Sequence, residues 1–284
     1  MAYIGVSEVI SDYLKSNQKT GKKSFDFLPV FCYSIVMTTT PVFDIRNLSF
    51  TWDKPKAVCS GTARYVITGF NAQLCSRQII TLIGRNGSGK STLLKILSGL
   101  NRRYDGDVFF CGQQLSGLRR SLLARSMSYM SQSSDEMPPF TVREIADMGN
   151  YAGLSGIDAR QADERTMMAL GLTGLTDKAD IPYSQLSGGY QQRVMLARAI
   201  CQSVNVMLLD EPMSGLDIVC KDSMMRTLRH IADTQDSLIM MSTHDIDLAK
   251  RYSDHILCFA GQTPQMLLPS ELTDEKIEEI FREE

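Results

Sequence analysis

Short apolar runs alternate with segments of helical spacing from about residue 42 to the end of the chain. Three runs are typical of strands buried in a parallel sheet, and they cover 78–84, 205–210 and 237–242. Segments with hydrophobic residues at helical intervals lie beside them in the sequence, at 91–99, 194–200 and 221–233. This alternation predicts an α/β fold.

Two regions depart from that alternation within the same domain. Residues 141–183 carry helical stretches rich in Ala, Met, Leu and Glu, which predict a separate helical lobe at about 133–190. Near the C-terminus, the pattern of residues 272–281 predicts one amphipathic helix with Thr273 as its N-cap. We place the whole domain at 42–284.

Residues 1–41 differ in character from the rest, and we expect a poorly ordered N-terminal extension. Its basic residues lie far inside, from Lys15 to Lys23, and no small-residue cleavage site follows Met37, which disfavours a targeting signal. One hypothesis is that Met37 is the natural start, because the domain begins soon after it. The longest apolar run, 27–37, is shorter than the roughly 20 residues needed to cross a bilayer.

Composition excludes some classes of function. The formal net charge is −2, which argues against the strongly basic surface typical of nucleic-acid-binding domains, so we expect no nucleic-acid partner. The seven cysteines are scattered and form no CxxC pair. They indicate neither a disulfide framework nor a zinc site, and a reducing compartment fits best.

A glycine-rich segment follows the first predicted strand and has the spacing GxxxxGK[ST], which is typical of a phosphate-binding loop between a strand and a helix. Glycines let successive N–H groups approach the phosphates, and the helix N-terminus adds partial positive charge. Lys90 would bridge the phosphates, and the Ser91 hydroxyl would bind Mg²⁺. The predicted ATP-binding residues here are Gly84, Arg85, Asn86, Gly87, Ser88, Gly89, Lys90, Ser91 and Thr92.

Polar residues also follow the other two predicted strands. Asp210 and Glu211 end the second run, and we assign Asp210 to the metal and Glu211 to positioning the attacking water as a general base. The alternative is that either carboxylate only caps the next turn. His244 follows the third run and could contact the γ-phosphate.

The ordered set of motifs resembles the ATP-binding subunits of ABC transporters over roughly residues 42–284. This resemblance rests on the phosphate loop, the acidic strand end and the run 186–193, Leu-Ser-Gly-Gly-Tyr-Gln-Gln-Arg, which is similar to the family signature. It implies a P-loop NTPase fold with an ABC-type helical subdomain and a small N-terminal antiparallel β subdomain.

The resemblance also implies roles for individual residues. Ser187, Gly188 and Gly189 would bind the ATP that the opposite subunit holds. Gln132 falls at the Q-loop, where it would contact Mg²⁺ and take part in hydrolysis. Asp217, in the run 214–217, resembles the D-loop residue that communicates across the dimer.

His244 resembles the switch histidine of the family. Trp52 falls where the family places an aromatic ring over adenine, and Phe50 is an alternative. The signature has Tyr190 where the family most often has glutamine, outside the Ser-Gly-Gly core.

By the same resemblance, two copies would close head to tail around two ATP molecules with Mg²⁺. The expected partners are a second ATPase subunit, transmembrane permease subunits and a periplasmic or extracellular substrate-binding protein. The chain would lie peripherally on the cytoplasmic face of the inner (plasma) membrane. The helical lobe and Gln132 would form the coupling surface.

The cargo is less constrained. The segments 139–145 and 272–281 resemble ATPases that import ferric siderophores, haem and cobalamin. Gly149 and Asn150 stand where those importers commonly have Gly-Arg, and 213–216 departs from their usual D-loop entry. We expect import of an iron(III) chelate or related metal complex, with zinc, manganese or another substrate as alternatives.

A different hypothesis is that the chain is a soluble ABC ATPase that acts on ribosomes or DNA. Such proteins usually carry two cassettes or a long coiled-coil insertion, and this chain has neither. A nucleotide-binding regulator without turnover is disfavoured because Lys90, Asp210, Glu211 and His244 are all present.

Overall fold

The computed structural model describes residues 41–53, 64–132, 139–153 and 158–282, with side chains at all of these except 152 and 153. They belong to one compact unit, Pro41–Glu284. The predicted extension at 1–41, apart from Pro41, and the hypothesis about Met37 lie outside the described residues.

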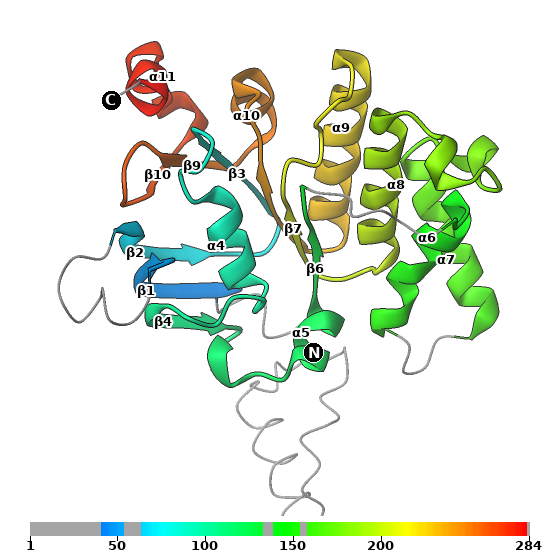
Figure 1. Ribbon diagram of the computed structural model, residues 1–284, viewed down its shortest axis with the longest axis horizontal. Coiled ribbons are helices and arrows are strands. Elements are labelled where there is room, and N and C mark those ends of the chain that lie inside the picture. Colours follow the sequence, from blue (N-terminus) through cyan, green and yellow to red (C-terminus); the bar gives the residue numbers. More distant parts are fainter. Residues whose placement is uncertain (1–40, 54–63, 133–138, 154–157, 283–284) are drawn as a thin grey trace, which may run out of the picture. The chain divides into compact units, whose positions relative to one another are not determined.

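A six-stranded sheet forms the centre of the unit, in the order β10-β9-β3-β8-β7-β6 (Figure 1). Neighbouring strands from β9 to β6 are parallel, and only β10 pairs antiparallel, with β9. Every residue of β7 and β8 is buried, as expected for strands covered on both faces. The strands are β3 (Gln78–Gly84), β6 (Met127–Met130), β7 (Val206–Leu209), β8 (Leu238–Ser242), β9 (His255–Phe259) and β10 (Gln265–Leu267).

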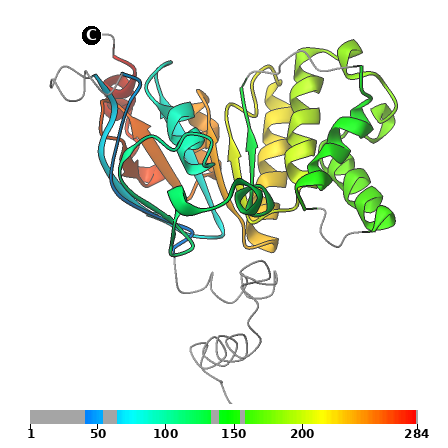
Figure 2. The same cartoon turned by 60° about the horizontal axis from the view of Figure 1, so that its bottom comes forward.

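A second sheet confirms the predicted antiparallel β subdomain, in the order β2-β1-β4-β5. Its core face is apolar, and the rings of Phe43 and Phe110 pack with centroids 5.2 Å apart. Figure 2 shows helix α4 between this sheet and the parallel one. The strands are β1 (Phe43–Thr51), β2 (Tyr65–Leu74), β4 (Asp105–Phe110) and β5 (Gln113–Gln114).

Five helices lie close to the two sheets. Helix α4 and helix α9 contact strands β3 and β8, and α9 has one apolar face with Met224, Met225 and Leu228 buried. Thus the pairing of helices with apolar strands that the sequence predicts is confirmed. The helices are α4 (Lys90–Leu97), α5 (Arg120–Ser126), α9 (Ile218–Thr234), α10 (Ile246–Tyr252) and α11 (Asp274–Phe281), with short 3-10 turns η1 (Leu115–Gly117) and η5 (Pro269–Glu271).

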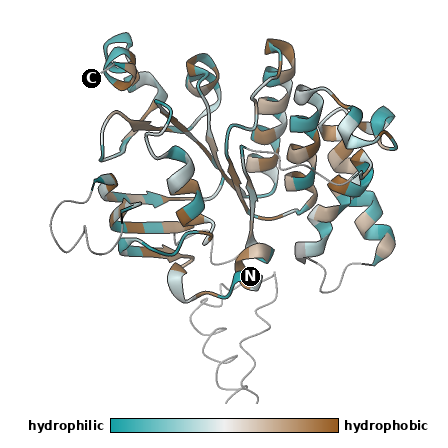
Figure 3. Cartoon of the chain, in the orientation of Figure 1, coloured by the Kyte–Doolittle hydropathy of each residue, from teal (hydrophilic) through white to brown (hydrophobic). Residues whose placement is uncertain are grey.

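The predicted helical lobe is also present. Its core is continuous with that of the parallel sheet, and Figure 3 shows brown, hydrophobic segments in both. Gly149 allows the close approach of η2 to α8, because a Cβ there would lie 2.3 Å from the Arg198 carbonyl oxygen. The elements are α6 (Val142–Asp147), η2 (Met148–Gly153), α7 (Ala159–Leu172), η3 (Thr176–Lys178), η4 (Tyr183–Gln185) and α8 (Gly188–Cys201).

Helix α11 confirms the prediction for the C-terminal segment. The Thr273 hydroxyl accepts a hydrogen bond from the Lys276 N–H at 3.3 Å, which makes Thr273 the N-cap. Ile280 is 2% exposed and packs with Ile256 and Leu272, with Ile277 and Phe281 at the edge of the cluster. The C-terminal helix therefore covers the β9 side of the sheet.

Within the described ranges, every helix is too short or too polar to span a bilayer. The cysteines there, namely Cys75, Cys111, Cys201, Cys220 and Cys258, are all free thiols.

Candidate nucleotide-binding site

The sheet order brings the predicted site residues to one edge. Strands β3, β8, β7 and β6 are parallel neighbours, so their carboxyl ends lie side by side. Gly84 ends β3, and His244 lies two residues beyond β8. Asp210 directly follows β7, and Gln132 lies two residues beyond β6 with an exposed side chain. Ligands of open α/β sheets bind at this edge.

The phosphate loop has three glycines at positive φ, Gly84, Gly87 and Gly89, and two of them are also closely packed. Gly84 has φ 149° and Gly89 has φ 111°, values that side chains disfavour. A Cβ at Gly84 would lie 2.8 Å from the Phe259 Cβ, and one at Gly89 would lie 2.8 Å from the Val66 Cγ1. The loop therefore packs tightly against both sheets, and helix α4 begins directly after it.

Lys90 is held inside the loop. Its Nζ donates to the carbonyl oxygens of Gly84 at 2.7 Å and Arg85 at 2.8 Å, and the residue is 5% exposed. Burial lowers the pKa of Lys90 below its usual value, while the charges of Glu211 and Asp210 act in the opposite direction. A cation placed among loop carbonyls is suited to bind an anion that enters the loop.

The residues at this edge fit a polyphosphate and a divalent cation. The Ser88 Oγ is buried without a hydrogen-bond partner among the described residues, so the loop has an unused donor. The first N–H groups of α4 have no partner within the helix and favour an anion. The Ser91 hydroxyl and the Asp210 carboxylate are hard oxygen donors of the type that Mg²⁺ prefers.

Ser242 connects the Asp210 carboxylate with the backbone of Glu211, the two acidic residues after β7. Its hydroxyl donates to the Asp210 Oδ1 at 2.7 Å and accepts from the Glu211 N–H at 2.8 Å. Asp210 is 3% exposed, and its N–H donates to the Met130 carbonyl at 2.8 Å. Asp210 is therefore held by strands on both sides, through its carboxylate on the β8 side and its backbone on the β6 side.

Glu211 has a left-handed backbone, with φ 51°. A non-glycine residue in that region stores strain, which is often found at functional sites. The Gln192 Nε2 donates to the Glu211 carbonyl at 2.7 Å and stabilises the turn.

His244 meets the Glu211 carboxylate. Its Nε2 lies 3.1 Å from the Glu211 Oε1, with the two side chains 42% and 15% exposed. This contact joins the two residues that the sequence assigned to hydrolysis, which come from the ends of different strands. A partly exposed carboxylate and imidazole in contact can orient water and move a proton.

The signature residues lie at the start of α8. Ser187 is the N-cap residue, but its exposed hydroxyl makes no capping hydrogen bond. A Cβ at Gly189 would lie 2.9 Å from the Gly215 carbonyl oxygen, so this position needs glycine to pack against the 214–217 loop. Asp217 in that loop caps α9 by accepting from the Cys220 N–H at 2.8 Å. Among the described residues, no hydrogen bond or ion pair joins Ser187 or Gly189 to the phosphate loop.

The structure separates the two candidates for an aromatic contact. Trp52 is 64% exposed at the end of β1, whereas Phe50 is 3% exposed. The two rings meet edge to face, with centroids 4.8 Å apart. Phe50 is buried and supports the Trp52 ring, so Trp52 is the residue whose ring a nucleotide base could contact.

Sequence reasoning missed Ser242 and Gln192. Both are ordinary polar residues whose roles depend on contacts between strand ends and a helix. Gln192 lies inside the run 186–193, which locates the residue in the sequence but does not predict its contact. Ser242 is only the last residue of an apolar run.

The fold and the edge geometry define a P-loop nucleotide-binding protein. Residues 67–214 match the ABC transporter family. The chain belongs to this family, and its domain is the family's ATPase domain.

Curated relatives have several different cargoes in their names. The chain is 32% identical over 225 residues to the petrobactin import ATP-binding protein FpuD of Bacillus anthracis, covering 77% of this chain and 82% of that protein. It is 36% identical over 199 residues to the aliphatic sulfonates import ATP-binding protein SsuB 1 of Xanthomonas axonopodis, covering 70% and 77%. Identity to the cobalamin import ATP-binding protein BtuD of Halobacterium salinarum is 31% over 195 residues, 69% of this chain but only 49% of that protein.

Solved structures confirm the fold. A metal-chelate type ABC transporter in an inward-facing conformation aligns with a TM-score of 0.69 at 24% identity, covering 85% of this chain and 89% of that one. A dimeric ATP-binding cassette, MJ0796, bound to ADP and Pi, aligns with a TM-score of 0.67 at 23% identity, covering 76% and 93%.

Proposed function

We propose that this chain is the ATP-hydrolysing subunit of an ABC importer. The observation that carries the proposal is the contact of His244 with Glu211, at the same sheet edge as the buried Lys90 and Asp210. One edge therefore holds an anion-binding loop, a metal-binding carboxylate and a pair able to position water. Phosphoryl transfer needs these parts.

Each residue has a distinct role in this proposal. Lys90 and the N–H groups of 84–92 bind the phosphates, while Trp52 stacks on adenine. Ser91, Asp210 and Gln132 hold Mg²⁺, which neutralises charge on the phosphates. Glu211 accepts the proton of the attacking water, and His244 orients the carboxylate and contacts the γ-phosphate.

A second copy completes the site. Ser187 and Gly188 are exposed, and the Ser187 hydroxyl makes no capping hydrogen bond to its own helix. Together with Gly189, they would bind the γ-phosphate held by the opposite subunit. Asp217 and its loop would transmit the closure of the dimer from one subunit to the other. The dimeric cassette among the structural relatives supports this arrangement.

The protein that the ATPase dimer drives would be a membrane protein. Permease subunits would dock on the helical subdomain and near Gln132, from the cytoplasmic face of the inner membrane, with a substrate-binding protein on the other side. The names of FpuD and BtuD favour an iron(III) chelate or related metal complex as cargo. The aliphatic sulfonates protein, at 36% identity, shows that relatives of this chain have other kinds of cargo, and zinc, manganese or another substrate are the alternatives.

The catalytic part is tested with Glu211→Gln. The amide keeps the size of the side chain but cannot accept the proton, so hydrolysis should fall by about 100-fold or more while ATP still binds. The variant should elute as a dimer in size-exclusion chromatography with ATP and as a monomer without it. Glu164→Gln, an exposed change on α7, is the control and should behave as wild type. A monomeric Glu211→Gln protein that hydrolyses ATP at the wild-type rate would refute the mechanism.

The transport part is tested by affinity purification of the tagged chain from detergent-solubilised membranes. Recovery of a polytopic membrane protein supports the importer, and ATP-dependent uptake of a panel of labelled chelates then tests the cargo. Recovery of ribosomal or DNA-repair proteins with no membrane partner would favour the soluble ABC ATPase instead.

A further inference from the structure

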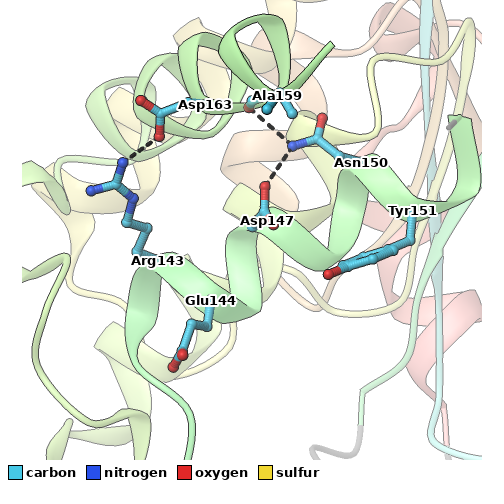
Figure 4. Close-up of a pocket in the computed structure, with 8 residues that line it drawn as sticks. Arg143, Glu144, Asp147, Asn150, Tyr151, Ala159 and Asp163 are labelled. Atoms are coloured by element: carbon cyan, nitrogen blue, oxygen red, sulfur yellow. Dashed lines mark hydrogen bonds and ion pairs between the residues drawn. The ribbon is translucent and has the colours of Figure 1, made fainter. Parts of the chain in front are cut away.

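An open pocket of about 380 Å³ lies in the helical subdomain, outside the nucleotide site. Its walls come from α6, η2 and the first turns of α7, as Figure 4 shows. Polar groups that line it contact each other, since Arg143 is paired with Asp163 and the Asn150 Nδ2 donates to the Asp147 Oδ1 at 2.9 Å. These contacts lie within the helical subdomain. A different polar cluster, between α9 and α10, reaches the edge of the sheet where His244 lies.

The segment 243–245 joins strand β8 to helix α10 and contains His244. Both neighbours of His244 make hydrogen bonds through the backbone. The Thr243 N–H donates to the Leu82 carbonyl of β3 at 3.1 Å, and the Thr243 Oγ1 accepts from the Asp245 N–H at 3.1 Å. The position of the His244 ring therefore depends on how these two neighbours are held.

The Asp245 carboxylate has a partner at each of its oxygens. Its Oδ1 accepts from the Leu248 N–H at 3.2 Å, which makes Asp245 the N-cap of α10. Its Oδ2 accepts from the Lys221 Nζ at 3.0 Å. Burial acts to raise the pKa of Asp245, but the Leu248 N–H and the Lys221 ammonium together hold it below its usual value. The Asp245 carboxylate is therefore ionised at neutral pH.

Lys221 comes from a different part of the chain, the first turn of α9. Its N–H donates to the Asp217 carbonyl at 2.9 Å, so it lies one helical turn after that residue. The Lys221 and Asp245 side chains are 25% and 27% exposed. Water and salt screen such a pair less than a fully exposed one. The ion pair therefore connects the segment that contains His244 to the start of α9.

A second polar contact joins the same two helices farther from His244. Asp222, the next residue of α9, accepts from the Tyr252 hydroxyl at 2.6 Å and from the Arg251 Nη1 at 2.9 Å, in the last turn of α10. This contact holds the far end of α10, whereas Lys221 holds the end next to His244. Removing the two contacts one at a time can therefore distinguish the docking of α10 from the position of His244.

We propose that Lys221 is a positioning residue for ATP hydrolysis, which holds Asp245 and thereby keeps the His244 ring against Glu211. A shift of the 243–245 segment by about 1 Å could lengthen the 3.1 Å contact between His244 and Glu211 beyond hydrogen-bond distance. The inference rests on the proposed function and deepens it by adding a residue outside the predicted motifs.

The experiment measures steady-state ATP hydrolysis by the full chain. Lys221→Met keeps the aliphatic stem but removes the charge, so kcat should fall about tenfold while KM for ATP stays within about twofold of wild type. Lys221→Arg keeps a cation and should restore most of the rate. Asp245→Asn keeps a side chain that can cap α10 but removes the negative charge, so it should resemble Lys221→Met. Urea denaturation checks that each variant is folded, and Asp245→Asn provides the same test if Lys221→Met does not fold.

A double variant tests whether Lys221 acts through the histidine. His244→Ala should slow hydrolysis, and adding Lys221→Met to it should cause no further loss of kcat. Asp222→Ala removes the other contact between α9 and α10 and should keep the wild-type kcat. An equal loss for Asp222→Ala, or a full tenfold loss for Lys221→Met in the His244→Ala background, would show that Lys221 acts only on packing and would overturn the inference.

The same measurements separate this inference from the proposed function. Wild-type kcat for both Lys221→Met and Asp245→Asn, with slow turnover by His244→Ala, overturns the inference alone. Wild-type kcat for His244→Ala overturns the role that the proposed function gives to that histidine.

Discussion

The sheet edge and the helical-subdomain pocket each contain a buried polar atom without a partner in the described chain, but their surroundings have opposite charge. At the edge, the Ser88 Oγ lies in a loop that also holds the buried cation Lys90. In the pocket, the Asn150 Oδ1 has no partner among the described residues, and the Asn150 Nδ2 donates to the Asp147 Oδ1 at 2.9 Å. The first site is suited to an anion, whereas the pocket is lined by three carboxylates and one guanidinium. The two regions therefore differ in the charge that surrounds their buried polar groups.

The two regions also differ in how they are built. The anion site comes mainly from the backbone of consecutive residues, with glycines at positive φ and a helix N-terminus. The pocket comes from side chains of three separate elements that the packing of α6, η2 and α7 brings together. Substitutions should therefore affect ATP chemistry at the first site and partner binding at the second. The following predictions test that separation.

The largest effect is expected for Lys90→Met. Loss of the buried ammonium removes the main positive charge for the phosphates, so ATP affinity should fall by about 100-fold or more. Isothermal titration calorimetry measures it. Lys95→Met, in the last turn of the same helix, is the control and should bind ATP as wild type does. Equal affinity of Lys90→Met and wild type would show that the loop backbone alone binds the phosphates.

Ser242→Ala should have a smaller effect on turnover. The change leaves the Asp210 carboxylate and the Glu211 N–H without their shared partner, and we expect about tenfold slower hydrolysis at saturating ATP. A phosphate-release assay measures the rate. Ser237→Ala, at the other end of the same apolar run, should retain full activity; an equal loss in both would point to a general effect on β8 stability.

Trp52→Ala should change substrate affinity more than chemistry. Loss of a stacking ring is expected to raise KM for ATP by roughly three- to tenfold with little change in kcat. Trp52→Tyr keeps an aromatic face and should restore most of the affinity. An unchanged KM for Trp52→Ala would assign the base contact to another residue.

Thr141→Ala tests the pocket side of the comparison and should have the smallest effect. Thr141 and Glu144 form a reciprocal capping box at the start of α6, with the Thr141 N–H donating to the Glu144 Oε2 at 2.8 Å. Its loss should lower the free energy of unfolding by about 1 kcal/mol, measured by urea denaturation. Thr141→Ser should be near neutral. ATPase activity of the isolated chain should not change, and a large loss would show that the two regions are coupled.

Much of the site could be predicted because it is local in sequence. The spacing of Gly84, Gly89 and Lys90 predicts the geometry of the phosphate loop, because that geometry depends on the backbone conformations of consecutive residues. The strand ends were also predictable, because unbroken apolar runs stop where polar residues such as Asp210 begin. The capping residue Thr273 was predicted for the same reason, since capping involves only neighbours in the chain.

Other features depend on residues far apart in the sequence. The choice of Trp52 over Phe50 followed from which ring the second sheet buries. The contact of Glu211 with His244 and the role of Ser242 followed from the neighbouring positions of β7 and β8. The pocket around Asn150 has no motif, because its residues are close only after α7 packs beside α6.

Local patterns along the chain are enough to predict the class of fold, the phosphate loop and the order of motifs that places this chain in its family. These properties follow from hydrophobic periodicity and from backbone preferences, both of which act over a few residues. Packing between distant segments sets which polar atoms have hydrogen-bond partners, and among the described residues the Asn150 oxygen has none. Burial and hydrogen bonding depend on contacts between segments that are distant in the sequence, so no local pattern predicts them.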